Sequence, residues 1–228
     1  MSAIIREERI GGQRLILGDS RAAIEYVGFD CVVTDPPYGM AFQSNHRKNK
    51  HRSIANDGDA DLLVWACGLA PAHSAYVWMR WDNLPDVPKP RSLITWVKNN
   101  WSMGDLEHEH GRQTEVCAFY PGGEHKWGKG RPSDVLQYPR TGNEHHPTEK
   151  PVGLMQAVVE WTRGHVLDPF MGSGTTLVAC QRLGRTGTGV EIDPEYWTIA
   201  CERVDEATRQ ADLFITPASR PTQEAMDV

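Results

Sequence analysis

The stretch VLDPFMGSGTT, residues 166–176, decides the fold. Its apolar start is typical of a short buried strand, and its end opens a helix predicted over about 175–183. Gly172 and Gly174 let the backbone between them approach a ligand closely, and a helix N-terminus offers unpaired N–H groups. A strand, a glycine loop and a helix in this order indicate a nucleoside or nucleotide site in an α/β domain.

The next predicted strand, 188–192, carries Glu191 near its end, where a carboxylate can accept hydrogen bonds from two ribose hydroxyls. No lysine follows the glycines, which excludes the phosphate loop of nucleotide triphosphatases. Gly174 is followed by Thr-Thr-Leu, so the dinucleotide fingerprint is incomplete. The loop therefore fits NAD poorly and S-adenosylmethionine well.

On both sides of this loop in the sequence, short apolar segments predicted as strands alternate with segments predicted as helices. This alternation predicts an α/β domain with a mostly parallel sheet. We find no linker inside the motif-bearing region, so we expect one domain over 1–215, a polar mobile loop over about 40–58 and a flexible tail over 216–228. The expected strands are 14–17, 30–34, 75–79, 93–97, 116–120, 166–167 and 188–192, and the other expected helices lie near 21–26, 62–69, 151–162 and 195–210.

A second motif, Asp35-Pro36-Pro37-Tyr38, follows the buried strand 30–34. Two prolines fix the backbone and remove two N–H donors, which leaves the carboxylate and a carbonyl as outward acceptors. Such a pair can accept both hydrogens of an exocyclic base amine and draw its lone pair out of conjugation. An aromatic ring at Tyr38 can stack on an extruded base, which is worth roughly 1–3 kcal/mol. A plain turn that ends a strand is the alternative, and it is favoured if this motif is considered alone.

The composition is that of an ordinary globular protein, with 39% hydrophobic and 24% charged residues. No signal peptide or membrane span is evident, and we expect a cytoplasmic protein. Five scattered cysteines and nine histidines form neither a disulfide framework nor a closed metal-ligand set, so we expect no metal. The net charge is −6, but screening makes local clusters matter more for a nucleic-acid partner. Two basic clusters are candidates for DNA binding: Arg47, Lys48, Lys50 and Arg52, and Lys126, Lys129 and Arg131.

Five elements in one order resemble the DNA amino-methyltransferases that make N6-methyladenine or N4-methylcytosine. They are LGD (17–19), TDPPY (34–38), HPTEKP (146–151), LDPFMGSGT (167–175) and GVEIDPEY (189–196), and they cover most of the chain. Because the DPPY motif precedes the glycine loop, the resemblance is to the circularly permuted beta class. It implies a Rossmann-like methyltransferase fold with a seven-stranded, mostly parallel sheet and helices on both faces.

The resemblance also implies a role for each matched residue. Asp35 and the Pro36 carbonyl hold the target amine, Pro37 completes the rigid turn, and Tyr38 stacks on the flipped base. Methyl transfer from S-adenosylmethionine is then a direct displacement without a covalent intermediate. The implied cofactor-binding residues are Asp19, Thr148, Lys150, Asp168, Pro169, Phe170, Gly172, Ser173, Gly174, Thr175, Glu191 and Ile192.

Duplex DNA is the implied partner, and members of this group often form homodimers. Adenine N6 is favoured because the motif begins with Asp, whereas N4-cytosine enzymes more often carry Ser. N4-cytosine methylation, RNA methylation and an inactive DNA-binding module on this fold are the alternatives. The target-recognition insert is expected over about 121–143, which is short and fits a restriction-modification or phage enzyme.

Overall fold

The computed structural model describes residues 4–37, 60–69, 71–101, 107–108, 110–141 and 149–214. The predicted loop 40–58, the tail 216–228, Tyr38, Thr148 and the cluster Arg47–Arg52 lie outside these residues. Within the described ranges, no helix combines the length and apolar character needed to cross a membrane.

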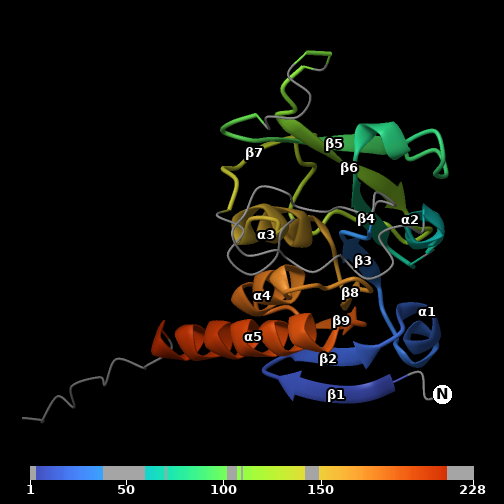
Figure 1. Ribbon diagram of the computed structural model, residues 1–228. Helices are drawn as coiled ribbons and strands as arrows, with labels where there is room; N and C mark the ends of the chain where they lie inside the picture. The colour runs from blue at the N-terminus through green and yellow to red at the C-terminus, as the bar shows by residue number, and fades with distance from the viewer. Residues whose placement is uncertain are drawn as a thin grey trace, which may run out of the picture.

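A nine-stranded sheet forms the centre of the protein, in the order β1-β2-β9-β8-β3-β4-β6-β5-β7 (Figure 1). The five strands from β2 to β4 in this order are mutually parallel, while β1 and β6 are antiparallel to their neighbours. The strands are β1 (Ile4–Ile10), β2 (Gln13–Gly18), β3 (Cys31–Thr34), β4 (Ser74–Met79), β5 (Ser92–Val97), β6 (Thr114–Pro121), β7 (Val135–Gln137), β8 (Val166–Asp168) and β9 (Gly187–Glu191).

The α/β prediction is confirmed, but the expected number of seven strands was wrong. The seven expected strands are all present, and β1 and β7 extend the sheet by one strand at each edge. β1 pairs with β2 through a hairpin at Gly11, whose positive φ of 55° suits glycine. β7 has only three residues and pairs in parallel with β5. Both strands are polar or very short, which is why their sequences carry little apolar signal.

Helices cover both faces of the sheet. On one face lie α3 (Val152–Trp161), α4 (Thr175–Arg182) and α5 (Pro194–Phe214), stacked side by side in Figure 1. On the other lie α1 (Ser20–Ala23), the short 3-10 helix η1 (Ile24–Tyr26) and α2 (Ala60–Gly68). A second 3-10 helix, η2 (Trp81–Asn83), follows β4.

The central strands are buried on both faces, as parallel strands between two helical layers should be. In β4, Tyr76 and Trp78 pack with α3, whereas Ala75, Val77 and Met79 belong to the core that faces α2. This continuous burial explains the unbroken apolar run of SAYVWM. It also fixes where the polar ends of these strands lie, because only the residues beyond each strand can reach solvent.

Candidate active site

The carboxyl ends of four adjacent parallel strands bring the predicted acidic residues to one edge of the sheet. Asp19 directly follows β2, Glu191 ends β9, Asp168 ends β8, and Asp35 directly follows β3. These strands are neighbours in the order β2-β9-β8-β3, so the DPPY motif and the glycine loop lie side by side although they are far apart in sequence. Ligands of open α/β sheets bind at this edge.

The glycine loop connects β8 to α4 in a conformation that its residues require. Gly174, at the N-cap of α4, has a left-handed φ of 82°, and a Cβ there would lie 2.9 Å from the Ala200 Cβ. The Ser20 hydroxyl on α1 donates to the Pro169 carbonyl and fixes the start of the loop from the other face. Contacts with α1 and α5 therefore hold both ends of the loop.

Glu191 faces this loop and accepts three backbone hydrogen bonds. Its Oε2 accepts from the Gly172 N–H at 2.9 Å, and its Oε1 accepts from the N–H groups of Ile192 and Asp193 at 2.9 and 2.8 Å. Burial raises the pKa of Glu191 to about 7, although these N–H groups pull it down. The carboxylate is thus fixed in place at the end of β9, with Ile192 beside it 40% exposed.

Asp168 joins the two motifs. Its Oδ1 accepts from the Thr34 hydroxyl at 2.7 Å and from the Phe170 N–H at 3.1 Å. Burial raises its pKa to about 6, because the side chain is almost fully removed from water. The resemblance assigned Asp168 to the cofactor. The structure shows that Oδ1 holds the end of β3, directly before Asp35, against the start of the glycine loop.

Arg203 on α5 binds the other side of the loop and was not predicted. Its Nη1 donates to the Ser173 carbonyl at 2.7 Å, to the Ser173 hydroxyl at 2.8 Å and to Thr175 Oγ1 at 3.2 Å. Its Nη2 forms an ion pair with Glu149 at 2.6 Å. The available signal was the spacing of Arg203, three residues after Ala200 and four before Ala207, which sets it beside the apolar face of the helix. Its partners lie too far along the chain to be read from the sequence.

Lys150 lies next to the DPPY motif. Its Nζ is 2.5 Å from Asp35 Oδ2 and 3.2 Å from Glu115 Oε2, and its side chain is only 4% exposed. Burial alone would lower the pKa of Lys150, but the two carboxylates outweigh it and the pKa is raised. Lys150 was expected to bind the cofactor, but its ammonium group is bonded to the Asp35 carboxylate.

Four of the remaining predicted residues also lie at this edge of the sheet. Asp19 lies at the same edge, where its side chain caps α1 by accepting from the Ala22 N–H at 3.2 Å, and Phe170 packs edge-on against Trp65 at 5.8 Å between ring centroids. Pro36 is buried and Pro37 half-buried after Asp35. These residues lie at or next to the loop and the DPPY turn.

The basic cluster Lys126, Lys129 and Arg131 lies at the opposite edge of the sheet. The adjoining Gly128 N–H donates to the Trp161 carbonyl at the C-terminus of α3, while Lys150 lies just before the N-terminus of that helix. Lys129 Nζ is paired with Glu160 at 3.1 Å. The structure therefore does not bring this cluster together with Asp35.

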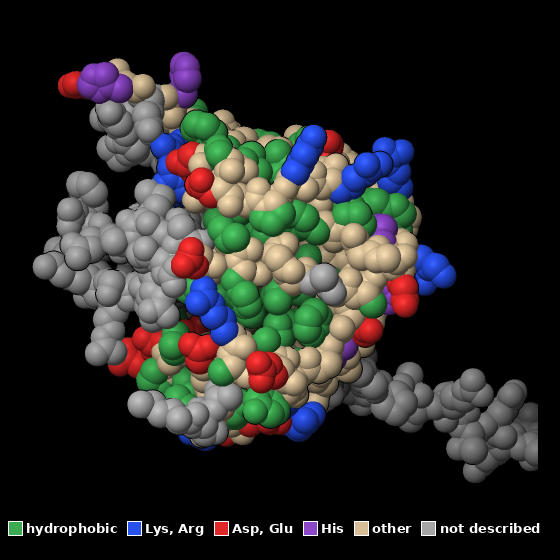
Figure 2. All heavy atoms as spheres, turned by 90° about the vertical axis from the view of Figure 1, so that its right-hand side faces the viewer, with side chains coloured by type: hydrophobic (Ala, Val, Ile, Leu, Met, Phe, Trp, Pro, Cys, Tyr) green, Lys and Arg blue, Asp and Glu red, His purple; other side chains and the backbone are tan. Residues whose placement is uncertain are grey.

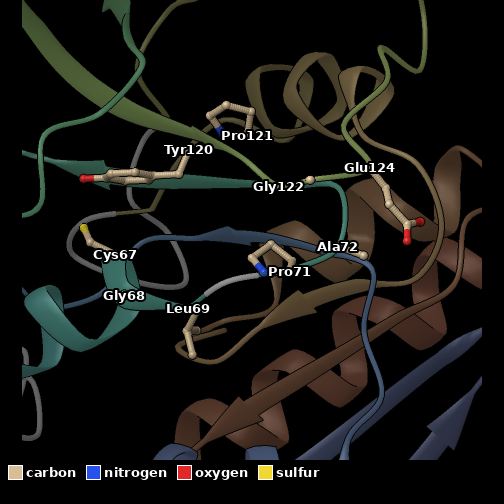
Figure 3. A pocket seen from close by; sticks show the side chains of 10 residues that line it. Cys67, Gly68, Leu69, Pro71, Ala72, Tyr120, Pro121, Gly122 and Glu124 are labelled. Carbon is tan, nitrogen blue, oxygen red and sulfur yellow. The ribbon is translucent and has the colours of Figure 1, made fainter.

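A cavity of about 570 Å³ also lies at that opposite edge (Figure 3). It is bordered by Leu69 after α2, by Pro71 and Ala72 before β4, and by Gly122 and Glu124 after β6. Since β4 begins at Ser74 and points away from this cavity, the cavity is separate from the Asp35 edge. Among the described residues, no three His, Cys, Asp or Glu side chains are placed to hold a metal ion.

Comparison with known proteins identifies the family. The chain matches the DNA methylase family over residues 94–202. YubD of Escherichia coli K12, which is named as a methylase, is 33% identical over 222 residues that cover 86% of this chain and 92% of YubD. The type II methyltransferase M.HpaI of Haemophilus parainfluenzae is 24% identical over 237 residues, 85% of this chain and 74% of M.HpaI.

Solved structures show the same fold. M1.HpyAVI, crystallised with S-adenosylmethionine, superposes with a TM-score of 0.64 at 24% identity, over 85% of this chain and 99% of that one. The cytosine-N4-specific PvuII DNA methyltransferase gives a TM-score of 0.64 at 15% identity, over 92% and 95%. The order of motifs, the geometry of the sheet edge and the extent of the match to YubD agree, and the chain belongs to the DNA methylase family of N6-adenine and N4-cytosine methyltransferases.

Proposed function

We propose that the protein transfers a methyl group from S-adenosylmethionine to adenine N6 in duplex DNA, with the target base extruded from the helix. The observation that supports this proposal most directly is the bond from Thr34 to Asp168, which holds the DPPY turn beside the glycine loop. A group bound to the loop is then next to a group bound by Asp35.

The cofactor fits the residues at this edge. Glu191 offers a fixed carboxylate for the ribose hydroxyls, and the exposed Ile192 side chain beside it offers an apolar surface for the adenine ring. The loop around Gly172 to Gly174 approaches a ligand with backbone atoms only. When bound, S-adenosylmethionine supplies the methyl group that is transferred.

The chain's own contribution to chemistry is to hold and deprotonate the amine. Asp35 and the Pro36 carbonyl accept the two N–H groups of the target amine, which frees the nitrogen lone pair for attack. The amine loses one proton on methylation, and the Asp35 carboxylate is the acceptor that we propose. Tyr38 is proposed to stack on the base, and the cluster Arg47, Lys48, Lys50 and Arg52 to bind phosphates. Both are outside the described residues.

The test uses the protein with labelled S-adenosylmethionine and unmethylated duplex DNA, followed by digestion to nucleosides. Label in N6-methyladenine that disappears in Asp35→Asn is the expected result. Label in N4-methylcytosine would keep the mechanism and overturn the choice of base, a result in line with the fold likeness to the PvuII enzyme. Cofactor binding without label in DNA, and without label when RNA replaces the DNA, would favour an inactive DNA-binding module.

A further inference from the structure

Four charged side chains of alternating sign form a continuous row behind the DPPY turn. Asp35 Oδ2 is 2.5 Å from Lys150 Nζ, which is 3.2 Å from Glu115 Oε2. Glu115 Oε1 is in turn 2.5 Å from Lys98 Nζ. Lys98 follows β5 directly and Glu115 lies near the start of β6, so the row runs from the catalytic edge across to the far strands of the sheet.

The row is largely shielded from water. The side chains of Lys150 and Lys98 are 4% and 10% exposed, and those of Asp35 and Glu115 are 20% and 23% exposed. Lys150 Nζ lies 5.7 Å from the centroid of the Trp78 ring, and Lys98 Nζ lies 4.9 Å from that of Trp96. Charges are weakly screened in such surroundings, so each one strongly affects its neighbours.

Lys150 is shared between two carboxylates, and only one of them belongs to the DPPY motif. Whatever strengthens the pull of Glu115 on Lys150 weakens the hold of Lys150 on Asp35. We propose that Glu115 and Lys98 are positioning residues that set how tightly Lys150 engages Asp35, and thereby how strongly Asp35 accepts the target amine. This inference rests on the proposed function and adds two residues that no motif contains.

The two positioning residues should act in opposite directions. Removing the charge of Glu115 ends its competition with Asp35 for Lys150, which makes the Asp35 carboxylate harder to protonate. Removing the charge of Lys98 lets Glu115 draw Lys150 away, which makes Asp35 easier to protonate. Direct Coulomb effects have the same signs, because Glu115 repels and Lys98 attracts the negative charge on Asp35.

Asp168 and the Cys117 thiol also interact with this row. Asp168 interacts electrostatically with Asp35, and it is unchanged in every variant below. The Cys117 thiol is fully buried, and burial raises its pKa well above the usual value, so it stays neutral. Neither group would move the Asp35 titration midpoint in opposite directions in the Glu115 and Lys98 variants.

The test measures the titration of Asp35 itself, with aspartate labelled in its carboxyl carbon and the signal assigned through Asp35→Asn. We expect the midpoint to move to lower pH in Glu115→Gln and to higher pH in Lys98→Met, each by on the order of one pH unit. Lys98→Arg should keep the wild-type midpoint. Lys129→Met breaks a solvent-exposed ion pair at the opposite edge and is the matched control that leaves it unchanged.

Unchanged midpoints, or shifts of the same sign in both variants, would overturn the proposal. Lys98→Met keeps the Glu115–Lys150 pair, so it provides a result even if Glu115→Gln fails to fold. Because the titration needs neither DNA nor cofactor, it tests the positioning role whether or not the wild-type protein methylates DNA. Where methylation is measured, the acidic limb of kcat against pH should shift with the midpoint, while cofactor affinity stays the same.

Discussion

At the scale of single residues, the ionised Glu191 carboxylate is expected to favour cofactor binding but to lower the stability of the folded protein. We expect Glu191→Gln to weaken S-adenosylmethionine binding by about tenfold or more, because charged hydrogen bonds to the ribose are lost. The measurement is isothermal titration calorimetry. Glu195→Gln, an exposed change on α5, is the control and should bind as the wild type does.

Comparison of the wild type with Glu191→Gln should also show how the ionisation of Glu191 affects stability as the pH changes. The folded-state pKa of Glu191 is raised from 4.5 to about 7, so ionisation favours the unfolded chain. The wild type without cofactor should therefore lose stability relative to Glu191→Gln as pH rises from about 4.5 to about 7, and the gap should be constant above that. Thermal melts at pH 4.5 and pH 8 test this, and an equal difference in Tm at both would contradict it.

Arg203 carries a prediction about the shape of the loop. Arg203→Lys keeps a positive charge near Glu149 but cannot make the forked contacts to Ser173 and Thr175. We expect weaker cofactor binding by about tenfold, with the binding of a DNA duplex unchanged. An unaltered Kd for S-adenosylmethionine would show that the loop does not depend on this arginine.

Sequence reasoning found the residues that end strands and missed those that act through partners. Asp35 and Glu191 were predictable because strand, turn and helix signals place them at one edge of a parallel sheet. Glu115, Lys98 and Arg203 were not, because their roles depend on contacts between distant segments. Lys150 was predicted as a site residue, but its contact with Asp35 was not.

At the scale of elements, apolar patterning predicted every strand that is buried. It failed for β1, whose residues Arg6 to Arg9 are all charged, and for β7, which is three residues long. β1 is held by its hairpin to β2, by the Arg14–Glu7 ion pair at 2.7 Å and by Arg6 over the Trp197 ring at 4.6 Å. Such contacts leave no periodic signal.

The β5–β6 connection is the element that we expect to contact DNA. Its described residues, 98–101, 107–108 and 110–113, extend away from the body of the protein (Figures 1 and 2), and Trp101 is 67% exposed. Trp101 packs so closely against Gly111 that a Cβ there would lie 2.5 Å from the indole ring. Because β5 is parallel to β4, this connection begins at the same edge as Asp35.

Trp101→Ala should therefore weaken binding of duplex DNA, by about tenfold if the indole stacks on a base. The salt dependence of binding should stay the same, because no phosphate contact is removed. The control is Lys126→Gln with Lys129→Gln and Arg131→Gln, which changes charge at the opposite edge and should affect affinity little. Fluorescence anisotropy at several salt concentrations measures both, and the reverse outcome would place the DNA at that opposite edge.

At the scale of the whole molecule, the two edges of the sheet have different tasks. The carboxyl edge combines the glycine loop, Glu191 and Asp35, whereas at the other edge loops are tied to strand and helix ends, for example by the bond from the His165 N–H to Asp30. A cofactor bound between β9, β8 and β3 contacts the centre of the sheet. Its binding energy should therefore stabilise the whole domain rather than one loop.

This coupling gives a prediction that separates binding from chemistry. At a concentration 100 times its Kd, S-adenosylmethionine should stabilise the folded protein by about 2.7 kcal/mol. For a chain of this size that corresponds to a rise in Tm of roughly 5–10 °C. Asp35→Asn should keep this rise, because Asp35 faces the amine, while Glu191→Gln should lose most of it at the same concentration. Loss of the rise in Asp35→Asn would mean that the DPPY turn is part of the cofactor site, and the division between holding the cofactor and holding the base would be wrong.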